Sequence, residues 1–141
     1  MKTKTLLLLC LLFGFSLTHL SAQTLKKGAV IAVSTYKITL QPGVTMNQYE
    51  DFLINKYLPE YEKNFPDSKM YILTGDRGEK KNQIGIMWYF ESVKVRDKYY
   101  PNETDLSAEA TAAWERMNPI STEESKYVSE STRVFTDWVI K

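Results

Sequence analysis

The residues of this chain whose types could do chemistry are mostly aromatic side chains with a polar tip. The 141 residues include nine tyrosines and three tryptophans. Such side chains suit a pocket for a flat organic molecule, because the ring gives apolar contact and the hydroxyl or indole N–H gives one directed hydrogen bond. We identify Tyr36, Trp88 and Trp114 as the first candidates for ligand binding. The alternative is that these rings only fill the core and a subunit interface.

Histidine and cysteine, the usual residues of metal sites and nucleophilic catalysis, occur once each. His19 and Cys10 both lie in an N-terminal segment that we expect to be removed. A mature chain without them has no zinc site of the usual ligand set, no thiol or Ser-His nucleophile, no imidazole base and no histidine-ligated haem. We therefore expect no metal and no cofactor. Acid–base chemistry by Tyr, Asp or Lys stays open, but the spacing of these residues selects no catalytic residue.

Residues 1–22 have the pattern of a secretory signal peptide. A short basic start precedes a strongly apolar stretch that is too short for a stable membrane span, and Ala22 stands where a signal peptidase would cut. We expect an exported protein, periplasmic or secreted, with a single domain over residues 23–141. A lipoprotein processed at Cys10 is the alternative, although few apolar residues precede that cysteine.

The charge of the mature chain argues against nucleic acid and membrane surfaces as partners. The whole chain has 18 basic and 17 acidic residues, and removal of Lys2 and Lys4 changes the formal net charge from +1 to −1. This balance leaves no basic footprint for nucleic acid and no polybasic face for anionic lipid. A chain of roughly 120 residues forms one domain that can bury its own core.

The elements that must position the aromatic candidates follow from apolar periodicity and turn signals. Thr45 and Gln48 form a capping box before a long helix that closes at residues 65–67, and Pro59 should kink or briefly break this helix. A short helix follows Ser92. Strands are expected at residues 29–40, 69–74, 83–91 and 132–141, and another helix from Ser107 to Asn118-Pro119, with a polar connection over residues 120–131.

The third strand is apolar on both of its faces. Trp88 lies on one face and Tyr89 on the other, and each is a plausible core residue, so the sequence does not decide which face meets the helices. A sheet with one solvated face should alternate apolar and polar residues, so the second face of this sheet should also be covered.

The predicted order is strand, helix, strand, strand, helix, strand. This order is typical of an α+β domain of the ferredoxin-like βαββαβ type, in which two helices cover one face of a four-stranded antiparallel sheet. The other face must find a partner. We therefore expect a homodimer that forms through the open sheet face, which would close the two sheets into an α/β barrel.

Four segments of the chain resemble a known family. They are residues 36–43 (YKITLQPG), 57–61 (YLPEY), 88–92 (WYFES) and 96–101 (RDKYYP), and the likeness extends over residues 29–141. The chain resembles the dimeric α/β-barrel superfamily, with its antibiotic-biosynthesis monooxygenase-like and NIPSNAP-like domains. The resemblance implies a cleft between sheet and helices, where Tyr36, Trp88 and Trp114 would lie.

Two functions of different classes remain open. The first, which we favour, is a non-catalytic exported dimer that holds a small apolar or aromatic ligand between sheet and helices. The second is a cofactor-independent enzyme, similar to the oxygenases or isomerases of the superfamily, that acts on an aromatic substrate. Superfamily members that bind haem through histidine differ from this mature chain, which lacks the ligand. A likeness of fold does not choose between the two functions.

Overall fold

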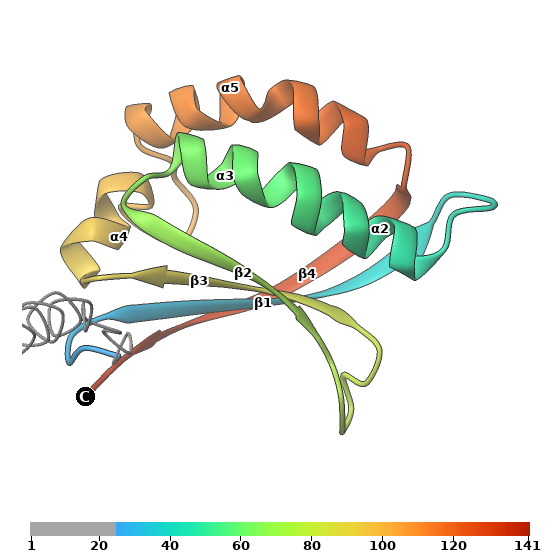
Figure 1. Cartoon of the computed structure of the whole chain (residues 1–141). Coiled ribbons are helices and arrows are strands. Elements are labelled where there is room, and N and C mark those ends of the chain that lie inside the picture. Colours follow the sequence, from blue (N-terminus) through green and yellow to red (C-terminus); the bar gives the residue numbers. More distant parts are fainter. Residues whose placement is uncertain (1–24) are drawn as a thin grey trace, which may run out of the picture.

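A computed structural model describes residues 25–141, and the predicted signal peptide, residues 1–22, lies outside these residues. The described residues form one four-stranded antiparallel sheet with helices on one side (Figure 1). The strands are β1 (Val30–Leu40), β2 (Ser68–Thr74), β3 (Ile84–Phe90) and β4 (Val128–Val139), in the spatial order β2-β3-β1-β4. The predicted ferredoxin-like fold class is therefore confirmed. Within residues 25–141 no helix has the length and apolar character needed to cross a membrane.

The long first helix consists of three consecutive pieces. These are α2 (Met46–Phe52), a π-helical turn η1 (Leu53–Tyr57) and α3 (Leu58–Asn64). The predicted capping box is present, because Thr45 Oγ1 accepts from the Gln48 N–H while the Gln48 side chain accepts from the Thr45 N–H. The wide turn ends with Leu58 donating to the Leu53 carbonyl, just before Pro59. The helix therefore absorbs Pro59 through a π turn, and its helical path continues without a break.

The second half contains α4 (Val93–Tyr99) and α5 (Ala108–Glu124). The hydroxyl of Ser92 accepts from the Val95 N–H and that of Ser107 from the Ala110 N–H, so each serine caps its helix. The predicted end of α5 at Asn118-Pro119 is wrong, because the helix runs through Pro119 to Glu124. Met117 is fully buried and Ile120 packs on the core, so tertiary packing outweighs the missing hydrogen bond of the proline.

The last strand also begins earlier than predicted. It starts at Val128 and not at Thr132, since only a short turn follows the extended α5. β4 pairs antiparallel with β1 along nearly its full length, from Val30 opposite Val139 to Leu40 opposite Val128. A longer β4 supplies hydrogen-bond partners for the whole of β1.

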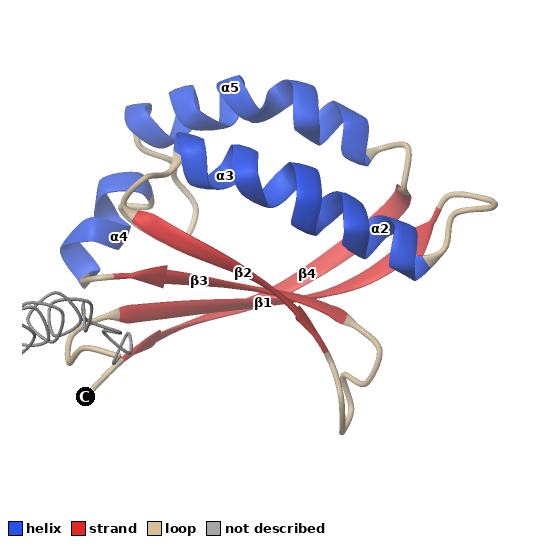
Figure 2. Ribbon diagram, viewed as in Figure 1, coloured by secondary structure: helices blue, strands red, loops and turns tan. Residues whose placement is uncertain are grey.

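The two faces of the sheet have different surroundings (Figure 2). Trp88 lies on the helix face, where it packs against the core together with the buried Ile86 and Phe90. The opposite face carries Tyr89 and Met87, which pair with Ile31 and Val33 of β1. No described helix covers this open face, and apolar side chains on it are exposed. They are Tyr71, Leu73, Val134 and Trp138, with exposed fractions of 40%, 37%, 70% and 60%.

Candidate functional site

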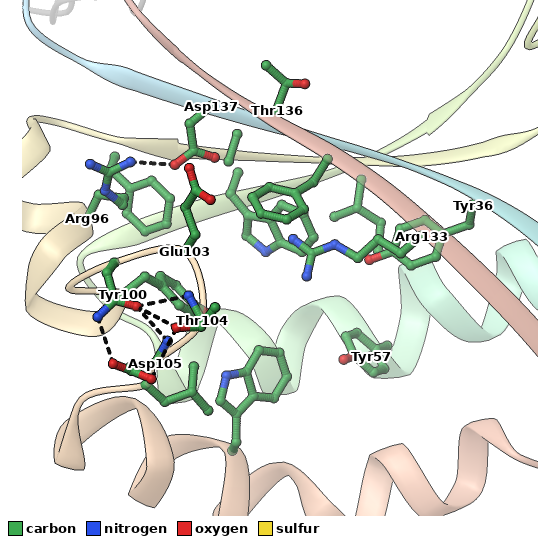
Figure 3. Close-up of a pocket in the computed structure, with 18 residues that line it drawn as sticks. Tyr36, Tyr57, Arg96, Tyr100, Glu103, Thr104, Asp105, Arg133, Thr136 and Asp137 are labelled. Carbon is green, nitrogen blue, oxygen red and sulfur yellow. Dashed lines mark hydrogen bonds and ion pairs between the residues drawn. The ribbon is translucent and has the colours of Figure 1, made fainter.

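A cavity of about 870 Å³ lies between the helix face of the sheet and α5, and the loop of residues 101–106 forms one end of it (Figure 3). The walls combine aromatic rings with a few charged side chains. The lining residues are Ala32, Tyr36, Tyr57, Ile86, Trp88, Phe90, Arg96, Tyr100, Asn102, Glu103, Thr104, Asp105, Leu106, Trp114, Arg133, Phe135, Thr136 and Asp137.

The structure brings together the three residues that the sequence singled out. Tyr36 comes from β1, Trp88 from β3 and Trp114 from α5, and all three line this cavity. All three also pack against the main core cluster, so each ring contributes to the core while one part of it faces the cavity. Ligand binding by these residues stays a prediction.

The phenol groups in the cavity are protonated donors at neutral pH. Burial raises the pKa of Tyr100 to about 12, against an opposing hydrogen bond from the side chain of Trp114. Burial also raises the pKa of Tyr57, and the negative charge of Glu124 adds to the effect. For Tyr36, burial raises the pKa more than the charge of Arg133 lowers it. None of these three phenols is therefore activated as a base.

Arg133 on β4 is a cavity residue that the sequence analysis missed. Its Nε donates to the hydroxyl of the fully buried Ser34 at 2.8 Å. The guanidinium carbon lies 5.4 Å from the ring centroid of Trp88 and 4.6 Å from that of Phe135. The available signal in the sequence was the alternation of side chains between the two faces of the last strand, which places Arg133 and Phe135 on the same face. That signal became useful only once the structure showed which face meets the helices.

The loop end of the cavity has its own charged groups. Arg96 on α4 donates through Nε to Asp97 at 2.7 Å and through Nη1 to Asp137 on β4 at 2.5 Å. The Asn102 side chain accepts from the backbone N–H groups of Thr104 and Asp105, and its amide donates to the Asp105 carboxylate at 2.7 Å. These bonds give the loop a fixed turn at the cavity end.

A second, smaller cavity of about 310 Å³ shares Tyr36, Tyr57 and Ile86 with the first one. Glu124 at the end of α5 lines it and accepts a hydrogen bond from the Tyr49 hydroxyl at 2.6 Å. Burial, followed by this hydrogen bond, raises the pKa of Tyr49 well above its ordinary value. Within residues 25–141, no three histidine, cysteine, aspartate or glutamate side chains come together as a group that could hold a metal ion.

No protein-family model and no curated protein matches this sequence. Solved structures do share its fold. A NIPSNAP family protein from Agrobacterium tumefaciens is 14% identical, with a TM-score of 0.50 over 77% of this chain and 90% of that one. A NIPSNAP-like domain protein from Burkholderia xenovorans is 9% identical, with a TM-score of 0.51 over 78% and 84%. These similarities confirm, at the level of the fold, the resemblance inferred from the sequence.

Proposed function

We propose that this protein is an exported, homodimeric binding domain that holds a small apolar or aromatic ligand in the cavity between its sheet and helices. The observation that carries the proposal is the cavity itself. Ligand pockets measure about 300 to 1,000 Å³. This space of about 870 Å³, which is open to solvent beside the exposed Arg133 and Phe135, falls within that range.

The composition of the walls supports an aromatic or apolar occupant. Tyr36, Trp88 and Trp114 come from three distant parts of the sequence and supply rings with polar tips to one space. Neutral phenols such as that of Tyr100, whose pKa burial raises to about 12, can donate a hydrogen bond without doing acid–base chemistry near neutral pH. Non-catalytic binding is therefore favoured over the cofactor-independent enzyme, which would need an activated base or a ligand that reacts by itself.

The open sheet face supports the dimer. Val134 and Trp138 are among the most exposed large apolar side chains in residues 25–141, and they lie on the face that no described helix covers. A twofold contact between two such faces would bury them in both subunits. Export rests on residues 1–22, whose charge and apolar pattern are typical of a signal peptide.

The proposal is tested by native mass spectrometry of residues 23–141 purified from the compartment to which the protein is exported. We expect a dimer that carries additional small-molecule mass, and the same compound should be recovered unchanged after incubation in air. Recovery of a converted compound would favour the enzyme. A bare monomer that binds no member of a panel of aromatic compounds would contradict both the dimer and the pocket.

A further inference from the structure

The positive charge of Arg133 has no carboxylate partner among residues 25–141. All ion pairs in this part of the chain involve other cations. The hydrogen bond that the Arg133 side chain makes there is from Nε to the neutral hydroxyl of Ser34, at 2.8 Å. A guanidinium has five N–H donors, so the four on its two terminal nitrogens are left for another acceptor.

Two ring contacts place this guanidinium at the cavity wall, and the Arg133 residue as a whole is exposed there. The guanidinium carbon lies over the rings of Trp88 and Phe135, at 5.4 Å and 4.6 Å from their centroids. Figure 3 shows the Arg133 side chain reaching into the cavity. An arginine held by its Nε and by stacking presents its terminal nitrogens as a planar pair, which matches the two oxygens of a carboxylate.

The carboxylates that line the cavity do not neutralise Arg133. Asp137 accepts from Arg96, and Asp105 accepts from the amide of Asn102. Glu103 belongs to the loop at the Arg96 end, and Arg133 enters from the other side (Figure 3). The cavity thus separates an acidic end from a cationic wall.

Other groups at this wall are also donors. The Trp88 indole N–H is buried and has no hydrogen-bond partner within the described part of the chain. It is covered in the present arrangement, so an acceptor reaches it only if a neighbouring side chain shifts.

We propose that the ligand of this cavity is an organic anion, an aromatic or apolar molecule whose carboxylate pairs with Arg133. This inference rests on the proposed function and specifies its ligand class.

The experiment compares two nearly isosteric probes, 2-naphthoate and its neutral analogue 2-naphthamide, by isothermal titration calorimetry on the mature dimer. We expect naphthoate to bind about tenfold more tightly or better, as a charged hydrogen-bonded pair implies. Arg133→Gln should remove this preference while leaving naphthamide binding within about twofold, which also shows that the variant is folded. Arg133→Lys should keep part of the preference.

The matched control is Arg77→Gln, which removes the same charge from the exposed hairpin loop, where Arg77 is 93% exposed. It should leave both affinities unchanged. Equal binding of the two probes to the unaltered protein, or equal loss of both in Arg133→Gln, would overturn the anion proposal alone. If neither probe binds the unaltered protein, this result would contradict the proposed aromatic pocket and also the anion proposal that rests on it.

Discussion

The guanidinium of Arg96, on α4, donates to the carboxylate of Asp137, near the end of β4, at 2.5 Å. The two side chains are 24% and 28% exposed, so water screens the pair only in part. β4 is an edge strand of the sheet, and this contact joins it to the short helix at the loop end of the cavity.

Loss of the Arg96–Asp137 pair should lower stability measurably. We expect a double-mutant cycle of Arg96→Gln and Asp137→Asn, followed by urea unfolding, to give a coupling free energy of about 1 kcal/mol, between the values of exposed and buried pairs. The matched control is the exposed pair of Lys63 and Glu60, spaced i,i+3 on α3. Its coupling should stay below about 0.5 kcal/mol. Equal couplings for the two pairs would contradict this interpretation.

Trp88→Ala should destabilise the protein by about 3 kcal/mol, because the ring packs against the core cluster as well as facing the cavity. The measurement is thermal or urea unfolding at a fixed protein concentration. Trp88→Phe keeps an aromatic ring in the same place and should lose less than half as much. A change in melting temperature of only about a degree in Trp88→Ala would contradict the core position of the ring.

Val134→Asp should convert the proposed dimer to a monomer. Val134 is 70% exposed on the open sheet face, and an aspartate there would place a charge inside a twofold contact. Light scattering after gel filtration gives the mass of the species. Ile54→Asp is the matched control, because Ile54 is 51% exposed on the first helix, away from the sheet face. A variant at Val134 that stays dimeric would show that the dimer forms elsewhere.

Asp67 should make stability depend on pH in the acid range. Hydrogen bonds from Lys98 and Tyr99 hold the pKa of its carboxyl below the ordinary value of 3.8. A carboxyl with a lower pKa in the folded protein adds stability above its unfolded pKa and loses it as the pH falls through the folded value. Asp67→Asn should therefore be less stable than the unaltered protein at pH 7, and the difference should shrink below about pH 4.

Urea unfolding at several pH values measures this difference. Asp51→Asn is a suitable control, since Asp51 lies on the exposed side of α2 and, within residues 25–141, its carboxylate accepts only from the nearby Asn55. A difference in unfolding free energy between the Asp67 variant and the unaltered protein that stays constant from pH 7 to pH 3 would contradict the assigned interaction.

Local signals in the sequence predicted much of the fold, because their physical cause is local. Thr45, Ser92 and Ser107 each accept a hydrogen bond from a backbone N–H at a helix start, and a capping residue needs only its neighbours to do so. The order of elements then restricted the sheet to few topologies. Tyr36, Trp88 and Trp114 were found for a similar reason, since a ring with a polar tip suits a half-buried wall wherever it occurs.

The remaining features depend on contacts between distant residues. Pro119 stays helical because the residues around it pack on the core, which no local rule shows. Arg133 faces the cavity because β4 pairs with β1 in one register, with Tyr36 opposite Arg133. A shift of one residue would place this cation on the other face of the sheet, so its role depends on a pairing between distant segments.

The π turn of Leu53–Tyr57 has a consequence for how this fold can vary. Residues before it, such as Tyr49 and Phe52, pack in one apolar cluster, whereas Tyr61 and Phe65 after it pack in another. A π turn holds one more residue than the α-helical turn it replaces. It therefore fits one extra residue into the helix without the rotation of about 100° that an added residue would cause in a regular α-helix. Deletion of the exposed Asn55 would therefore restore a regular α-helical turn and leave Tyr57 facing the cavity wall. The helix can thus lose one residue at this point while the aromatic rings on either side keep their places in the two clusters.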